Sequence, residues 1–120
     1  DAVLVEVAKR MQQCLRESDT VARIGGDEFT VLLPDVGTEE AAMNVAEKIR
    51  AAMIAPIDAD GYSLTTSASI GVAIFPFHGL NATDLMNNAD AAMYAAKSKG
   101  RNTIVMYGEH TVKITLKDLI

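Results

Sequence analysis

The residues with the clearest chemical potential are two adjacent acids that follow a pair of glycines, in the order Gly25-Gly26-Asp27-Glu28. Glycine carries no Cβ, so a ligand can approach the backbone closely at this point. Carboxylates hold Mg²⁺ well when substrate phosphates supply further oxygens. Successive residues of an extended chain point to opposite sides, so one of the two acids faces a given ligand. A metal here therefore needs a second acid or a phosphate from elsewhere.

The competing interpretation of the same residues is a plain β-hairpin with solvated acids. Two β-prone runs flank the glycines, one from Thr20 and one from Phe29 to Leu33. A Gly-Gly pair between such runs predicts a hairpin, because the favoured turns need positive φ. Short motifs have a high false-positive rate, so local physics alone favours this plainer interpretation.

Three further groups of polar residues are weaker candidates. Lys97 and Arg101 flank a helix end at Gly100, where cations could hold phosphates but more often only complement the helix dipole. Arg16 and Asp19 are three residues apart at another helix end, a spacing typical of a local ion pair of small energy. The histidines, at positions 78 and 110, have no third ligand at a spacing suited to zinc.

Apolar spacing predicts the elements that must position these residues. Residues recurring every three or four positions predict helices over 3–15, 39–55 and 83–99. We expect N-caps at Thr38 and at Asn81 or Thr83, and a C-terminal stop at Gly100. Strands are predicted from Thr20, at Phe29–Leu33, near Ile57, at Tyr62–Phe75 and at Thr103–Tyr107, with residues 108–120 as an edge strand or a linker.

The resulting order, α-β-β-α-β-β-α-β, predicts an α/β sandwich in which helices pack on a mostly antiparallel sheet. Gly71 lies within the longest predicted strand, so it marks either a bulge or a close backbone contact. The chain starts inside its first helix without a preceding turn, so we expect the sequence to begin in mid-domain. A strand missing upstream would pair centrally in the sheet.

Composition limits the class of protein. A chain of 120 residues with 49% hydrophobic and 22% charged residues predicts one soluble globular domain. Its net charge of -5 argues against a broad nucleic-acid surface, so we expect no nucleic-acid partner. The single Cys14 suits a reducing compartment. No apolar run has membrane-spanning length and no signal peptide is evident, so we expect a cytoplasmic domain without direct membrane contact.

In combination, these motifs resemble the GGDEF family of diguanylate cyclases. Gly25-Gly26-Asp27-Glu28-Phe29 matches the family signature word for word, and Arg16-x-x-Asp19 precedes it at the family's usual distance. The run from Thr66 to Ala73 resembles the family's long strand. Asp90-Ala-Ala-Met-Tyr94-x-Ala-Lys97-x-x-Gly100-Arg101-Asn102 resembles its last helix and exit. The resemblance covers residues 1 to about 107 and implies a ferredoxin-like fold of the nucleotidyl-cyclase or polymerase-palm type.

The resemblance also implies a reaction: two GTP molecules condense to cyclic di-GMP with loss of two pyrophosphates, across a homodimer and with Mg²⁺ (or Mn²⁺). It assigns backbone approach to Gly25 and Gly26, metal binding and base catalysis to Asp27, and a supporting acidic role to Glu28. Further implied roles are phosphate binding by Lys97 and Arg101, guanine recognition by Asp1, and inhibitory product binding by Arg16, Asp19 and Lys48.

One departure from the family separates two functional hypotheses. The family's first strand, which carries its own metal-binding acid, and the next helix, with a guanine-reading asparagine, have no counterpart in these 120 residues. We therefore expect residues 1–107 to be an N-terminally truncated GGDEF domain that is inactive alone and active in the intact protein. The alternative is a non-catalytic module that binds GTP or cyclic di-GMP as a sensor.

Overall fold

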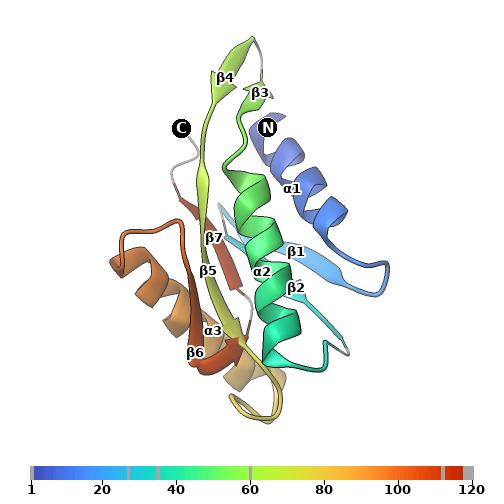
Figure 1. Ribbon diagram of the computed structural model, residues 1–120, viewed down its shortest axis with the longest axis vertical. Helices are drawn as coiled ribbons and strands as arrows, with labels where there is room; N and C mark the ends of the chain where they lie inside the picture. The colour runs from blue at the N-terminus through green and yellow to red at the C-terminus, as the bar shows by residue number, and fades with distance from the viewer. Residues whose placement is uncertain (1, 27, 35, 60, 112, 118–120) are drawn as a thin grey trace.

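The computed structural model of the chain describes residues 2–26, 28–34, 36–59, 61–111 and 113–117. These described ranges form three helices and seven strands (Figure 1). The helices are α1 (Ala2–Cys14), α2 (Glu39–Met53) and α3 (Ala82–Ser98). The strands are β1 (Thr20–Gly25), β2 (Glu28–Leu32), β3 (Ile57–Ala59), β4 (Tyr62–Leu64), β5 (Ser67–Ala73), β6 (Ile104–Thr111) and β7 (Lys113–Lys117).

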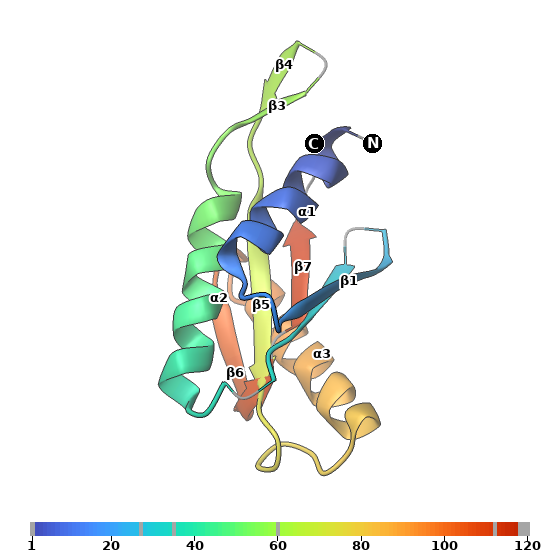
Figure 2. The same cartoon turned by 90° about the vertical axis from the view of Figure 1, so that its right-hand side faces the viewer.

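Five of the strands form one sheet in the order β1-β2-β7-β5-β6, and β3 and β4 form a separate two-stranded sheet. Within the large sheet, β1 with β2, β2 with β7, and β7 with β5 pair antiparallel, while β5 and β6 pair parallel. The predicted mostly antiparallel sheet is therefore confirmed. The small sheet projects from one end of the molecule, beyond the end of α2 (Figure 2).

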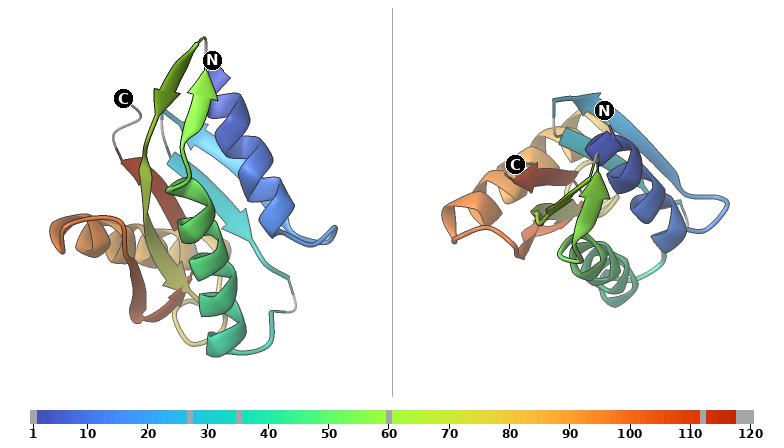
Figure 3. Two further views of the ribbon diagram at one scale, coloured as in Figure 1. Left: turned by 45° about the horizontal axis from the view of Figure 1, so that its top comes forward. Right: turned by 90° about the horizontal axis from the view of Figure 1, so that it is seen from above.

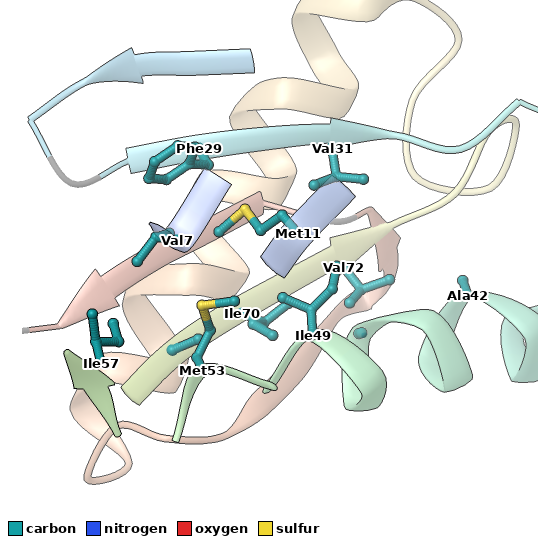
Figure 4. Close-up of a cluster of buried hydrophobic side chains, with 12 residues drawn as sticks. Val7, Met11, Phe29, Val31, Ala42, Ile49, Met53, Ile57, Ile70 and Val72 are labelled. Atoms are coloured by element: carbon teal, nitrogen blue, oxygen red, sulfur yellow. The ribbon is translucent and has the colours of Figure 1, made fainter. Parts of the chain in front are cut away.

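Helices cover both faces of the large sheet (Figure 3). Side chains alternate along a strand, so one face of β5 carries Ala68, Ile70 and Val72, which lie in the core beneath α1 and α2. Figure 4 shows this core, with apolar side chains from α1, α2, β2 and β5 meeting between the helices and the sheet. Its fully buried members include Val7, Met11, Ile49 and Met53.

The opposite face of β5 packs against α3 through Gly71. A Cβ placed on Gly71 would lie 2.3 Å from the backbone nitrogen of Met93 and 2.4 Å from the carbonyl oxygen of Ala89. Such distances are far below van der Waals contact, so only glycine lets the backbones of β5 and α3 approach this closely. Of the two sequence-based alternatives for Gly71, the close backbone contact is the one observed.

Local signals in the sequence correctly located the helix ends. Thr38 is the N-cap of α2 and accepts a hydrogen bond from the Ala41 N–H at 3.1 Å. Asn81, rather than Thr83, is the N-cap of α3 and accepts from the Asp84 N–H at 2.9 Å. Gly100 follows the end of α3 with a φ of 102°, the left-handed geometry for which glycine is favoured.

Two strand predictions differ from the structure. The single strand predicted over Tyr62–Phe75 is two strands, β4 and β5, because β4 turns away to pair with β3 in the small sheet. Residues 108–120 were predicted as an edge strand or a linker, but β7 lies in the middle of the large sheet, between β2 and β5. The inner backbone groups of β2 and β5 need hydrogen-bond partners, and only a strand in this position supplies them to both.

A side chain from α1 closes the C-terminal end of α2. The Arg10 guanidinium donates to the carbonyls of Ala52 at 3.0 Å, Ala55 at 2.6 Å and Pro56 at 2.6 Å. Its Nε also donates to Glu6 at 3.0 Å. The carbonyls of the last helical turn have no partner within the helix, so Arg10 satisfies groups that would otherwise need water.

Candidate functional site

The glycine turn joins β1 to β2, as the sequence predicted. Gly26 has a φ of 53°, and a Cβ placed on either Gly25 or Gly26 would meet no atom within 4 Å. The Arg23 Nε donates to the Gly26 carbonyl at 2.8 Å and so closes the turn from its β1 side. Asp27, the principal predicted metal ligand, lies outside the described residues. What the described part offers is an open turn with room for a ligand against the backbone.

Glu28 is the described acid of the signature. It is the first residue of β2, is partly buried, and pairs across the sheet with Gly25 on one side and with Thr115 of β7 on the other. Its carboxylate therefore belongs to an ordered strand end rather than to a solvated loop. This supports the interpretation of the turn as a site, although the role of Glu28 stays a prediction.

The second candidate group lies at the C-terminal end of α3. The ammonium of Lys97 lies 5.4 Å from the centre of the Tyr94 ring, within range of a cation–π contact. The backbone closes this helix end by itself: the N–H groups of Lys99, Gly100 and Arg101 donate to the carbonyls of Ala95, Lys97 and Ala96. The helix end therefore does not need a cationic side chain to satisfy those carbonyls.

The sheet register brings these two groups to the same end of the sheet. Glu28 of β2 is opposite Thr115 of β7, which is opposite Ser69 of β5. The next residue of β5, Ile70, pairs with Ile104, and its N–H donates to the Thr103 carbonyl at 2.9 Å. Adjacent strands are about 4.8 Å apart, so roughly 14 Å separates the backbones of β2 and β6 at this level. A triphosphate together with long basic side chains can span such a distance.

Arg16 and Asp19 form a clasp at the base of the hairpin. Asp19 accepts from the Arg16 backbone N–H at 2.8 Å, and its Oδ1 lies 3.2 Å from the Arg16 Nη2. The same Nη2 donates to the carbonyl of Pro34, just beyond β2, at 2.9 Å. The Asp19 side chain is 1% exposed and that of Arg16 is 58% exposed. The predicted local ion pair is therefore present, and it also ties the chain before β1 to the chain after β2.

Lys48 lies beside the end of α1, in the same region. The Cys14 thiol approaches the Lys48 carbonyl at 3.8 Å. Burial raises the pKa of this thiol, and the charge of Lys48 partly opposes that effect. Lys48 itself is exposed. The backbone of α2 at position 48 is thus close to the end of α1, and the role of Lys48 in an anion site stays a prediction.

The remaining predicted residues are not part of a described site. Asp1 lies outside the described residues, as does the side chain of His110. The Nδ1 of His78 accepts a hydrogen bond from the Ile74 N–H at 3.2 Å, which gives this ring a structural partner. Across the described ranges, no group of three or more His, Cys, Asp or Glu side chains could hold a metal. A magnesium ion at the turn would therefore depend on Glu28, on Asp27 and on phosphate oxygens, a donor set that suits Mg²⁺.

Sequence reasoning missed two arginines that the structure shows to be engaged. One is Arg10, described above. The other is Arg50 of α2, whose Nη1 donates to the side-chain oxygen of Asn102 at 3.1 Å, while its Nε and Nη2 donate to Glu47. Hydrogen bonding to Arg50 lowers the pKa of Glu47 and, reciprocally, raises that of the guanidinium. Only the Glu47–Arg50 and Glu6–Arg10 spacings were visible in the sequence, because the other contacts join distant segments.

A separate hollow lies at the other end of the sheet. It is a mostly apolar cavity of about 430 Å³ between the ends of β2 and β5 and the start of α3. Its lining includes Thr30, Leu33, Ala73, Leu85 and Met86. It contains none of the residues predicted to bind nucleotide. The open glycine turn, rather than this cavity, therefore remains the candidate site.

Comparison with known proteins identifies the family and agrees with the fold. The family model for the diguanylate cyclase GGDEF domain matches residues 1–103. This chain belongs to the GGDEF family. The diguanylate cyclase TpbB of Pseudomonas aeruginosa is 46% identical over 104 residues, and the match covers 86% of this chain. The diguanylate cyclase A of Treponema denticola is 41% identical over 107 residues, covering 88% of this chain and 29% of the relative.

Solved GGDEF structures confirm the fold. The crystal structure of the GGDEF domain of TpbB, also called YfiN, superimposes with a TM-score of 0.86 at 44% identity, covering 89% of this chain and 67% of that one. The cyclase SiaD, solved with its activator SiaC, gives a TM-score of 0.77 at 36% identity, covering 86% of this GGDEF chain and 39% of SiaD. The predicted palm-type α/β architecture is thus confirmed. The chain spans only about a quarter of TpbB's length (24%).

Proposed function

We propose that this GGDEF chain is the greater part of a diguanylate cyclase domain, which condenses two GTP into cyclic di-GMP and two pyrophosphates. The observation that supports the proposal is the sheet register, which puts two groups of residues at the same end of the sheet. The open Gly25-Gly26 turn and Glu28 come from the hairpin, and Lys97 and Arg101 come from the exit of α3. Carboxylates beside a glycine turn can bind Mg²⁺, and two basic side chains can bind the phosphates, so this set of residues suits a nucleoside triphosphate with its magnesium.

Each residue then has a defined task. The bare backbone at Gly25 and Gly26 admits the nucleotide, and Lys97 and Arg101 neutralise the outer phosphates. The 3′-oxygen of one GTP bonds to the α-phosphorus of the other as the bond to the pyrophosphate breaks, and Asp27 accepts the proton of that hydroxyl. Two such steps close the ring. Magnesium, held by Asp27 and Glu28 with phosphate oxygens, would neutralise charge that develops during transfer.

We further propose that the central position of the sheet belongs, in the complete domain, to a strand from outside these 120 residues. A structure described as comprising only the GGDEF domain of TpbB is longer than the part that this chain covers, which is 62% of it. The position between β2 and β5 adjoins Glu28, so an acid on an incoming strand could supply the second metal ligand. The strand β7 would fill the position only in the absence of that strand.

The decisive experiment uses GTP, Mg²⁺ and detection of cyclic dinucleotide by chromatography. The complete domain, with the residues that precede position 1, should form product, and the same domain with Asp27→Ala should form none. The 120-residue chain should bind GTP weakly and form no product. Product from the Asp27→Ala variant would overturn the assignment of the site. Product from the 120-residue chain would overturn the need for an added strand.

A second candidate function, a cyclic di-GMP sensor without catalysis, is supported by the Arg16–Asp19 clasp. The Arg16 side chain is 58% exposed, and Lys48 lies on the part of α2 whose backbone contacts the end of α1, so we infer that both cations contact an anionic guanine nucleotide. If the site inhibits an active enzyme, Arg16→Ala should relieve product inhibition and leave the initial rate unchanged. If the protein is only a sensor, cyclic di-GMP will bind while GTP yields no product, and Arg16→Ala will abolish that binding.

A further inference from the structure

The turn that follows α3 has an unusual backbone. Three successive residues have positive φ: Gly100 at 102°, Arg101 at 67° and Asn102 at 44°. Glycine adopts such angles freely and asparagine tolerates them, but an arginine in this region is strained. Strain of this kind persists only where surrounding contacts hold the backbone, and it often accompanies a functional site. Contacts around this turn must therefore hold its backbone in place.

Two kinds of contact hold it. The backbone N–H of Arg101 donates to the Ala96 carbonyl at 3.1 Å, within the end of α3. The side chain of Asn102 accepts a hydrogen bond from the Nη1 of Arg50, 52 residues earlier in the chain, at 3.1 Å. The first contact is local, but the second fixes the turn to a different helix. Arg50 thus connects α2 to the residue directly after Arg101.

The guanidinium of Arg50 is itself oriented. Its Nε and Nη2 donate to the two carboxylate oxygens of Glu47, at 2.8 Å and 2.5 Å. A two-point pair of this kind fixes the plane of the guanidinium, which leaves Nη1 directed at Asn102. The Arg50 side chain is 23% exposed and that of Glu47 is 54% exposed. The carboxylate of this pair is more than half exposed, and a pair of this kind contributes little to folding.

We propose that Arg50 is a positioning residue that, through Asn102, holds Arg101 in the orientation in which it binds the phosphates of a nucleoside triphosphate. This inference rests on the proposed function and deepens it. Arg50 does not touch the ligand. It lowers the free energy that the chain would otherwise spend on ordering the turn when phosphate binds, which is the usual benefit of preorganisation.

The test measures binding to the 120-residue chain by titration calorimetry, with two probes: GTP with Mg²⁺, and inorganic pyrophosphate. Arg50→Ala and Asn102→Ala should each weaken pyrophosphate binding about tenfold, equivalent to about 1.4 kcal/mol. Combining Arg50→Ala with Arg101→Ala should weaken binding no further than Arg101→Ala alone, because Arg50 acts only through Arg101. Lys9→Ala, which removes an exposed charge on α1, is the matched control and should change neither affinity.

A second measurement reports on the turn without any ligand. In Arg50→Ala, hydrogen exchange at the Arg101 amide should accelerate, while exchange in the middle of α3 stays unchanged. Unaltered pyrophosphate affinity in both Arg50→Ala and Asn102→Ala would overturn the inference and leave the proposed function standing. Additive losses in the Arg50/Arg101 double variant would also overturn it. If the parent chain binds neither probe, the proposed function and this inference both fail.

Discussion

The helices α2 and α3 lie on opposite faces of one sheet and end in different ways. The end of α2 is closed by a side chain from another helix, Arg10 of α1, which donates to three carbonyls. The end of α3 is closed by its own backbone, with Gly100 in a left-handed conformation. The cation at α2 therefore contributes to stability. Because backbone hydrogen bonds close the end of α3, the Lys97 ammonium is not needed as a cap and is suited to a ligand.

The two helices also differ in how they pack against the sheet. Apolar side chains such as Ile49 and Met53 hold α2 in a deep core. By contrast, α3 approaches β5 so closely that backbone meets backbone at Gly71. Side chains can relax around a substitution, but backbone segments in contact cannot. The face that carries the candidate phosphate-binding helix is thus the less tolerant of change.

The largest effect should come from Gly71→Ala. The new methyl group would lie 2.3 Å from the backbone nitrogen of Met93, so α3 must move away from β5. We expect a loss of about 3 kcal/mol or more in the free energy of unfolding, measured by urea denaturation. Gly25→Ala is the control, because a Cβ there meets nothing within 4 Å. Equal losses in the two variants would contradict the close-contact interpretation.

Arg10→Ala should have the next largest effect. It removes hydrogen bonds to three carbonyls and an ion pair with Glu6, from a side chain that is 15% exposed. We expect a loss of about 2–3 kcal/mol, because the part-buried carbonyl of Ala52 loses a charged donor and two exposed carbonyls lose theirs as well. The neighbouring exposed cation supplies the comparison: Lys9→Ala should change the unfolding free energy by less than about 0.5 kcal/mol. A similar change in both would mean that α2 does not depend on Arg10.

Gly100→Ala should have a smaller effect. The φ of 102° is unfavourable for alanine, although a Cβ there meets no atom within 4 Å. The cost is therefore one of backbone conformation alone, about 1–2 kcal/mol. Thermal unfolding followed by circular dichroism would measure it. If Gly100→Ala lowers the unfolding free energy more than Arg10→Ala does, the end of α3 contributes more to stability than the end of α2, contrary to this prediction.

The smallest effect on stability should come from Lys97→Ala. Lys97 is partly exposed and its ammonium contacts the Tyr94 ring, so the unfolding free energy should change by less than about 0.5 kcal/mol. If Lys97 binds phosphate, the same variant should weaken pyrophosphate binding by tenfold or more. This separation of stability from binding is what the comparison of the two helix ends predicts. A large loss of stability would place Lys97 among the structural cations, with Arg10.

Local and periodic signals in the sequence were sufficient for most of the fold. The caps at Thr38 and Asn81, the stop at Gly100 and the glycine hairpin each depend on neighbouring residues, and each is observed. The central position of β7 could not be predicted, because it depends on the gap between β2 and β5. Likewise, β4 separates from β5 through its pairing with β3, a choice of partner that alternation does not specify.

The candidate site was predictable to a similar degree. The signature at Gly25 and the basic pair at Lys97 and Arg101 were visible as motifs. Sheet register explains why both groups lie at the same end of the sheet. Contacts over long sequence separations were not visible. Arg10 meets carbonyls about 45 residues later, and Arg50 meets Asn102 52 residues later. Neither contact has a periodicity or a motif that a single sequence would reveal.

The clasp at the base of the hairpin makes its two ends interdependent. Arg16 bonds Pro34 across 18 residues, so the segment from the end of α1 to the end of β2 is a closed loop with the glycine turn at its tip. An anion that takes the guanidinium away from Pro34 releases that closure. If that release changes the affinity of the tip for its ligand, thermodynamic reciprocity requires the ligand to change the anion's affinity at the base by the same factor.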